Sequence, residues 1–327
     1  MNGGGRLLPA SSLIVKGVFM EKKRKAKVSM HKTLNKEQTS YHLMILPSII
    51  MLLIFNYIPI GGFVMAFQNF KPAKGIFRSE WVGFQHFERL FSSDLFGELI
   101  RNTLVISLGK IVLKLFVAVT FAILLNEIRV KWLKKNVQTI VYLPHFLSWA
   151  VLAPIMFNLL GIDGLINQAL NSFGIDAIDF VGSNKFFQGT IIGTGIWKEF
   201  GYGSIVYLAA ITAVDPGLHE AAAIDGASWW RRVWHVTLPA MLPIIIMMLA
   251  IDVGNVLSAG FDQVYNMYSP RVQETGDILD TYVYRAGLQD RQYSYSTAVS
   301  IFKSTIGLAL MLSVNALSRK FLNRSIF

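Results

Sequence analysis

The chain has 327 residues, of which 53% are hydrophobic and 16% charged, and it carries a net charge of +11. This composition excludes the two soluble domains that the length alone would allow, and it predicts a polytopic membrane protein. The complete lack of cysteine excludes a disulfide framework, a thiolate metal site and a cysteine nucleophile.

Residues 1–40 form a basic, polar segment, which we expect to be a cytoplasmic tail that only helps to set topology. Its apolar run over 13–20 is short and is interrupted by Lys16, so it is a poor signal peptide. Met20 is an alternative start position. A net charge of +11 could also indicate nucleic-acid binding, but the distribution of the basic residues argues against it.

Six later segments are long and apolar enough to cross a bilayer, whose core requires about 20 residues. They lie at 43–67, 103–125, 139–160, 187–214, 240–261 and 299–321. We therefore expect an all-α permease domain over 41–322 with a short cytoplasmic C-terminus, 323–327. Prolines within or beside these segments predict kinks or helix ends at Pro47, Pro59, Pro144, Pro154 and Pro243.

The distribution of lysine and arginine predicts that both termini are cytoplasmic. With that orientation, eighteen of these residues lie in the inner segments and nine in the outer loops. Basic residues favour the cytoplasmic side of a membrane. The same orientation places the segment 215–239, between the fourth and fifth spans, inside the cell.

Span two carries Lys110 and Lys114 one turn apart, near Ser107. Two like charges on one helix face repel each other, so we expect compensation by a carboxylate such as Asp252, by an acidic substrate or by water. The alternative is that the lysines reach the membrane surface or pair internally.

Polar residues of spans four and five recur at helical spacing and are candidates for a translocation pathway shared with a partner subunit. The alternative is helix packing through small and polar residues. We also include Lys198, and we expect Lys198 and Glu199 to point apart because they are sequence neighbours. The face of span four contains Thr190, Thr194, Trp197, Gly201 and Ser204, and that of span five contains Asp252, Asn255, Ala259 and Asp262.

The segment 215–239 predicts two short helices separated by a break. Asp215 can cap the first helix, Gly226 can end it in a left-handed conformation, and Ser228 can cap the second. The second helix is expected to be amphipathic, with a tryptophan-rich side suited to the membrane interface and basic residues towards the other side. The first side contains Trp230, Val233, Trp234 and Thr237, and the other contains Arg231, Arg232 and His235.

This segment resembles the EAA signature of ABC importer permeases, in which E-A-A is followed by Gly and then by I-x-L-P. The matching stretches are 220–222, 225–227 and 236–239, with Val236 in place of the usual Ile. The resemblance implies a coupling helix that docks into a cleft of a cytoplasmic ATPase. The residues expected at that contact are Glu220, Ala221, Ala222, Asp225, Gly226, Ala227, Arg231, Leu238 and Pro239.

From Tyr41 to its C-terminus the chain resembles the oligosaccharide branch of this family, the maltose-permease relatives, and within it the group for aldouronates and alginate. Residues 81–91 are similar to the W/F-V-G-L-x-N-F element of sugar permeases, expected as a short helix on the outer face. The aromatic segments 262–268 and 280–285 suit sugar stacking or an interfacial belt. Additional spans of the maltose permease are missing here, so its sugar contacts are not carried over.

The resemblance implies a type I ABC importer permease in the bacterial inner membrane, with six transmembrane helices. Its implied partners are a second homologous permease, two ABC ATPase subunits and an extracytoplasmic solute-binding protein. ATP and Mg²⁺ would bind to the ATPase, and this chain would hold no cofactor and catalyse no reaction. The expected substrate is an acidic oligosaccharide, compatible with five basic residues in the first outer loop, and the alternative is a neutral one.

Two other classes of function fit the sequence less well. An ion-coupled secondary transporter would use Asp252, Lys110 or Lys198 as a proton relay, but it has no use for a coupling segment. An intramembrane enzyme would need paired catalytic groups, which are not evident. His219-Glu220 lacks the second histidine of a zinc motif because residue 223 is Ala, and the sequence holds no G-x-x-x-x-G-K-[ST] phosphate loop.

Overall fold

The computed structural model describes residues 38–322, and it divides the chain into two units, 1–63 and 64–327. Most of the expected basic tail 1–40 and the expected C-terminus 323–327 lie outside the described residues. In the first unit, residues 38–52 are α-helical and continue into the π-helix η1 (Leu53–Tyr57) and the 3₁₀-helix η2 (Ile58–Phe67). No residue between 38 and 63 is buried within the described structure.

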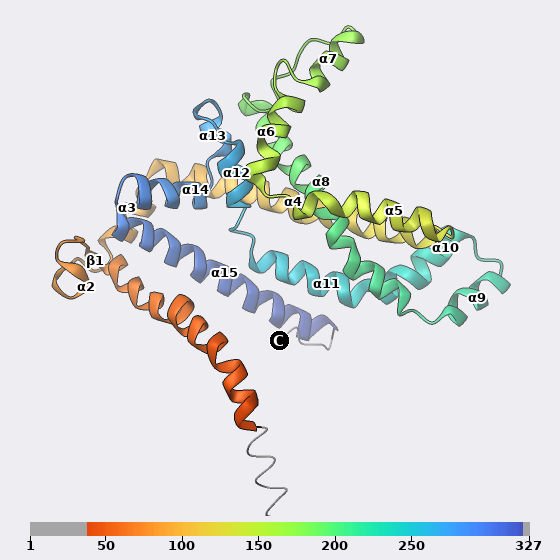
Figure 1. Ribbon diagram of the computed structural model, residues 1–327, viewed down its shortest axis with the longest axis horizontal. Helices are drawn as coiled ribbons and strands as arrows, with labels where there is room; N and C mark the ends of the chain where they lie inside the picture. The colour runs from red at the N-terminus through yellow and green to blue at the C-terminus, as the bar shows by residue number, and fades with distance from the viewer. Residues whose placement is uncertain (1–37, 323–327) are drawn as a thin grey trace, which may run out of the picture. The chain divides into compact units, whose positions relative to one another are not determined.

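Two long helices, α4 (Asp94–Glu127) and α8 (Asn184–Thr212), form the centre of the second unit and run along each other (Figure 1). Small residues let them approach closely. A Cβ at Gly109 would lie 2.6 Å from Ile192 Cδ1, so a side chain there would displace the end of that isoleucine. The pair therefore serves as the support on which the other helices of this unit are placed.

Two apolar clusters pack further helices against this pair and leave a polar stretch between them. In one, Ile106, Phe187 and Ile191 pack against Val264 and Met267 of α12 (Phe261–Met267). In the other, Ala122 and Tyr207 pack against Val233, which precedes α11 (Leu238–Gly254), and against Met241 at the beginning of that helix. The segments 107–114 of α4 and 195–199 of α8 lie between the two clusters.

The helix expected over 139–160 is broken. α5 (Lys131–Tyr142) ends in a 3₁₀ turn, η3 (Leu143–Phe146), and α6 (Trp149–Leu160) begins after Leu147 and Ser148, which are extended. Pro144 has no backbone N–H and so cannot donate the hydrogen bond that would continue α5, although Leu143 before it keeps helical dihedral angles. A short helix, α7 (Leu165–Ser172), follows α6.

The helix expected over 240–261 ends early, at Gly254. Residues 255–260 form a linker, and Gly260, with φ of +90°, precedes α12. Asp252, Asn255, Ala259 and Asp262 therefore do not share the face of one continuous helix. The two glycines explain the break, because Gly weakens a helix and Gly260 adopts a left-handed conformation.

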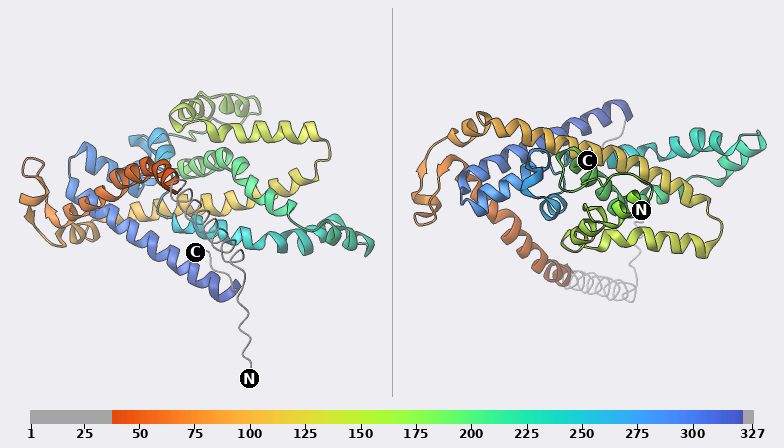
Figure 2. Two further views of the ribbon diagram at one scale, coloured as in Figure 1. Left: turned by 60° about the horizontal axis from the view of Figure 1, so that its bottom comes forward. Right: turned by 90° about the horizontal axis from the view of Figure 1, so that it is seen from above.

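Two groups of short elements lie at opposite ends of the second unit (Figures 1 and 2). At one end are α9 (Pro216–Ile224), α10 (Trp229–Arg232) and the π-helix η4 (Val233–Thr237). At the other end, β1 (Gln68–Asn69) pairs antiparallel with β2 (Glu80–Trp81), beside α2 (Gly75–Arg78) and α3 (Gln85–Phe91). The other elements of this unit follow α12 in the chain. They are η5 (Pro270–Val272), α13 (Gln273–Gly276), α14 (Leu279–Tyr284), η6 (Arg285–Gln289) and α15 (Tyr293–Leu322).

Within residues 38–322, five helical segments are long and apolar enough to cross a membrane by length and composition. They are Gln38–Phe67, Asp94–Glu127, Trp149–Ser172, Trp229–Gly254 and Tyr293–Ala316. α8 is not one of them, although its 29 residues span about 43 Å. It is less apolar because it carries Lys198 and Glu199 together with several glycines and threonines.

Candidate functional site

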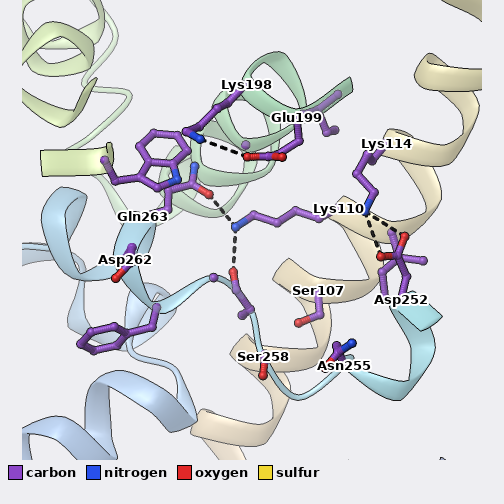
Figure 3. A pocket seen from close by; sticks show the side chains of 17 residues that line it. Ser107, Lys110, Lys114, Lys198, Glu199, Asp252, Asn255, Ser258, Asp262 and Gln263 are labelled. Carbon is purple, nitrogen blue, oxygen red and sulfur yellow. Dashed lines mark hydrogen bonds and ion pairs between the residues drawn. The ribbon is translucent and has the colours of Figure 1, made fainter. Parts of the chain in front are cut away.

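A cavity of about 610 Å³ opens between α4, α8, the end of α11, the linker 255–260 and α12 (Figure 3). Its lining is rich in charged side chains, which are costly inside a membrane protein unless they are paired or hydrated. The charged lining residues are Lys110, Lys114, Lys198, Glu199, Asp252 and Asp262. A polar cavity of this kind, surrounded by apolar helices, is the strongest candidate for a functional site in the described part of the chain.

Lys114 and Asp252 form an ion pair across the cavity wall. Lys114 Nζ lies 2.8 Å from one carboxylate oxygen of Asp252 and 2.9 Å from the other. The two side chains are 32% and 24% exposed, so the pair is partly shielded from solvent. Asp252 is thus the carboxylate that compensates one of the two lysines of α4, which was one of the possibilities derived from the sequence.

Lys198 and Glu199 do not point apart, contrary to the expectation for sequence neighbours. Lys198 Nζ lies 3.1 Å from Glu199 Oε1 and also donates to the backbone carbonyl of His145, at 2.8 Å. Glu199 Oε2 lies 2.8 Å from His145 Nδ1. Both side chains bond to His145 in η3, Lys198 to its backbone carbonyl and Glu199 to its ring. Because both side chains are long, they can meet there although their Cα atoms are neighbours on a helix.

Lys110 differs from the other two lysines because its hydrogen-bond partners among the described residues are neutral. Its ammonium group donates to the Ala259 carbonyl at 2.7 Å and to Gln263 Oε1 at 2.6 Å (Figure 3). Gln263 is 2% exposed and is itself fixed by α8, since its Nε2 donates to the Ile191 carbonyl at 2.7 Å. Lys110 therefore connects α4 to the linker and, through Gln263, to α8.

Two glycines leave the space that Lys110 and Gln263 occupy. A Cβ at Gly195 would lie 2.9 Å from Gln263 Oε1 and 3.0 Å from Lys110 Cε. A Cβ at Gly260 would lie 3.0 Å from Lys110 Nζ. The hydrogen-bond network at this wall of the cavity thus depends on the lack of side chains at both positions.

The structure brings together five of the six residues predicted for the pathway. Lys110, Lys198, Asp252, Asn255 and Asp262 all line the cavity, although Asn255 and Asp262 reach it from the linker and from α12. The sixth, Trp197, does not line it and is 43% exposed. Within the face predicted for span four, Ser204 is buried and bonds to a backbone carbonyl of its own helix, as the packing alternative requires. Buried Thr194 also accepts a hydrogen bond from Gln263 Nε2, at 2.9 Å, and so contacts a residue that lines the cavity.

Sequence reasoning missed several lining residues. Gln263 is the most important of them. Its position in the sequence directly after Asp262, a predicted pathway residue, could have indicated that it lines the cavity. Trp149 and Ser258 lie in segments that were interpreted only as parts of continuous spans. Ser107 was noticed beside the lysines but not assigned a place in the site.

A second pocket, of about 470 Å³, lies among α12, α14, η6 and α15, and Phe261 lines both cavities. Asp280, Val283 and Tyr284 of the aromatic segment 280–285 line it. Tyr265 and Tyr284 pack with ring centroids 4.9 Å apart, and their hydroxyl groups lie 3.4 Å apart. The hydrogen bond to Tyr284 is the main cause that raises the pKa of Tyr265.

The segment 215–239 has the two helices and the break that its sequence predicts. The Asp215 side chain accepts a hydrogen bond from the Gly217 N–H at 2.9 Å, which caps α9. Gly226 has φ of +75°, its N–H bonds to the Ala223 carbonyl, and the Ala227 N–H bonds to the Ala222 carbonyl. This is the Schellman pattern of a helix end.

One detail of this segment differs from expectation: Ser228 occupies the capping position of α10, but in the described structure its side chain accepts no capping hydrogen bond. Trp230 and Trp234 are each 63% exposed, whereas Val233 and Thr237 are each 5% exposed. Val233 packs in an apolar cluster with Tyr207, while the two tryptophans remain accessible.

Residues 118–323 match the model of a protein family described as "Binding-protein-dependent transport system inner membrane component". Among curated proteins of Bacillus subtilis (strain 168), the polygalacturonan/rhamnogalacturonan transport system permease protein YteP is 45% identical over 292 residues, covering 89% of this chain and 91% of YteP. Protein LplB of the same organism is 39% identical, covering 88% of this chain and 90% of LplB.

Solved structures give a similar result. A chain of a bacterial ABC transporter involved in the import of the acidic polysaccharide alginate aligns with a TM-score of 0.80 and 38% identity, over 88% of this chain and 97% of that chain. A chain of the alginate transporter in complex with an alginate pentasaccharide-bound periplasmic protein aligns with a TM-score of 0.81 and 37% identity, over 89% and 97%. These similarities extend over most of this chain and nearly all of each relative.

Proposed function

This chain belongs to the family of binding-protein-dependent transport system inner membrane components, and from that premise we propose that it is the permease subunit of an ATP-driven importer of uronate-containing oligosaccharides. It is an all-helical, multi-pass, non-catalytic membrane subunit with the ABC importer permease fold, as the resemblance of its sequence implied. The observation that carries the proposed substrate is the 45% identity, over 89% of this chain, to a permease named for polygalacturonan and rhamnogalacturonan.

The proposed assembly contains a second homologous permease, two ABC ATPase subunits and an extracytoplasmic solute-binding protein. α8 supplies the sixth span, and both termini lie in the cytoplasm. The position of α9 and α10 at one end of the second unit and of β1, α2 and α3 at the other supports contact with different partners on opposite sides of the membrane (Figure 2).

The proposed ATPase contact is the exposed segment formed by α9, α10 and η4. No residue of α9 is buried within the described structure, and Glu220, Ala221 and Ala223 leave a small, accessible surface for another backbone. ATP and Mg²⁺ bind to the ATPase subunits. Closure of the ATPase dimer moves these short helices. Val233 and Met241 pack in one apolar cluster with Ala122 of α4 and Tyr207 of α8, so the movement is passed on to α4 and α8. The cavity between those helices is then exposed to the outer side.

The proposed pathway for the sugar passes through the 610 Å³ cavity, where Lys110, Lys198, Asp252, Asn255 and Asp262 are available to it. Hydroxyl-rich substrates suit a lining that offers both donors and acceptors. One observation favours a neutral oligosaccharide instead: the lining contains three lysines and three acidic residues, so its formal charges balance. The ion pairs of Lys114 and Lys198 leave Lys110 and Asp262, and the hydrogen-bond partners of Lys110 among the described residues are neutral, so its ammonium group is available to a carboxylate.

Uptake by the complete importer in proteoliposomes tests this proposal. We expect radiolabelled oligogalacturonate to accumulate only with ATP inside the vesicles and with the binding protein outside. A neutral galacto-oligosaccharide of the same length should accumulate at least about tenfold more slowly, which corresponds to about 1.4 kcal/mol of discrimination. Faster uptake of the neutral sugar would overturn the acidic assignment, and uptake without ATP would overturn the importer itself.

A further inference from the structure

We propose that Lys110 is the residue of this chain that selects substrates carrying a carboxylate, by forming an ion pair with that group inside the cavity. The proposal rests on the proposed function, since it takes the cavity as the route of the sugar. It goes beyond that function because it names the residue that sets the substrate class.

The first argument is the difference between Lys110 and the other two lysines of the cavity. The ammonium groups of Lys114 and Lys198 already have carboxylate partners, Asp252 and Glu199. Among residues 38–322, the side-chain and backbone partners of Lys110 are a carbonyl and an amide oxygen, which carry no charge. An incoming carboxylate therefore meets at Lys110 a cavity ammonium group that has no carboxylate partner among the described residues.

The second argument is the geometry of the ammonium group. A lysine ammonium has three N–H donors, and two are directed to the Ala259 carbonyl and to Gln263 Oε1. Lys110 also lines the cavity, so the third donor is left for a group that enters it (Figure 3). Gln263 is fixed by α8, and Gly195 and Gly260 keep the path of the side chain open, so the ammonium is held in place before the ligand arrives.

An independent observation at the same place points to a ligand. Ser107 lies one turn before Lys110 on α4 and also lines the cavity. It is 3% exposed, and no group of the described chain forms a hydrogen bond with its hydroxyl. A buried hydroxyl without a partner is unfavourable. A sugar hydroxyl next to the bound carboxylate would supply the missing partner.

The test compares uptake of oligogalacturonate with uptake of the same oligosaccharide after its carboxyl groups have been reduced to hydroxymethyl groups. The complete importer is used with an unchanged binding protein, so that any change in the ratio of the two rates arises in the permease. Lys110→Met removes the charge and keeps the length of the side chain. We expect it to lower the acidic-to-neutral ratio about 10- to 100-fold, the range for loss of a hydrogen bond to a charged group.

Three further variants keep the test decisive. Lys110→Arg keeps the charge and should retain most of the selectivity. Lys110→Gln keeps two donors for Ala259 and Gln263 but has no charge, so it should lose selectivity like Lys110→Met even where the latter assembles poorly. Lys185→Met, at an α8 position that does not line the cavity, should leave the ratio unchanged.

The outcomes separate the two proposals. Equal loss of acidic and neutral uptake in Lys110→Met and Lys110→Gln, or no change in the ratio, would overturn the role of Lys110 while the importer assignment stands. A wild-type importer that prefers the reduced sugar would instead overturn the acidic substrate class.

Discussion

Gly226→Val is expected to reduce substrate-stimulated ATP hydrolysis about 10- to 100-fold while leaving membrane insertion intact, a cost of the size expected for a strained backbone position. Gly226 adopts φ of +75° at the Schellman end of α9. A Cβ at this position would meet no atom within 4 Å, so the cost comes from the backbone conformation alone. A β-branched residue is especially unfavourable there. The direction of α9 relative to α10 would then change, and with it the surface offered to the ATPase.

Gly226→Asn is the matched control for this prediction. Asparagine tolerates the left-handed conformation better than other residues with a side chain, so this variant should retain most of the coupling. Both variants are measured as complexes with the ATPase and the binding protein. Equal hydrolysis by the Val and Asn variants would contradict a role for the backbone conformation of Gly226.

Asp252→Asn is expected to reduce transport at least about tenfold, because it leaves the charged Lys114 without its partner inside a membrane protein. The ion pair is short, at 2.8 Å, and only partly exposed. Removal of one member of such a pair is more damaging than removal of both, since the remaining charge has lost its compensation. The measurement is the initial rate of uptake together with the thermal stability of the purified complex.

The double variant Lys114→Met/Asp252→Asn tests the same ion pair by removing both of its charges. It removes both charges and keeps the net charge of the cavity, so it should be more stable than Asp252→Asn. A double-mutant cycle should give a coupling of about 1–3 kcal/mol, as for residues in direct contact. A coupling near zero would show that the two groups do not stabilise each other in the assembled importer.

Local signals in the sequence predicted parts of this structure well. The Asp215 cap and the left-handed Gly226 follow from the preferences of single residues, and both are present. Asp252 was one of three candidates to compensate the lysines of α4, and it pairs with Lys114. Such features depend on neighbouring residues or on the high cost of an unpaired charge in a membrane, so they can be read without the tertiary structure.

Features that depend on tertiary contacts were not predicted. The spacing of Asp252, Asn255, Ala259 and Asp262 is compatible with one continuous helix, yet the linker 255–260 interrupts it. These residues converge because the linker folds around the Lys110 ammonium, a contact between positions 149 residues apart. The pairing of Lys198 with Glu199 likewise required His145, which lies 53 residues earlier. Periodicity within one segment contains no information on such distant partners.

The most direct test of the account is a cross-link from the exposed surface of α9. The chain has no cysteine, so Ala221→Cys introduces a single thiol, at an exposed position. A thiol-attached photocrosslinker is activated in membranes that contain the whole importer, and the adduct is identified by mass spectrometry. The account predicts an adduct with the ATPase subunit. An adduct formed instead with the extracytoplasmic binding protein would place this segment outside the cell and contradict the assignment.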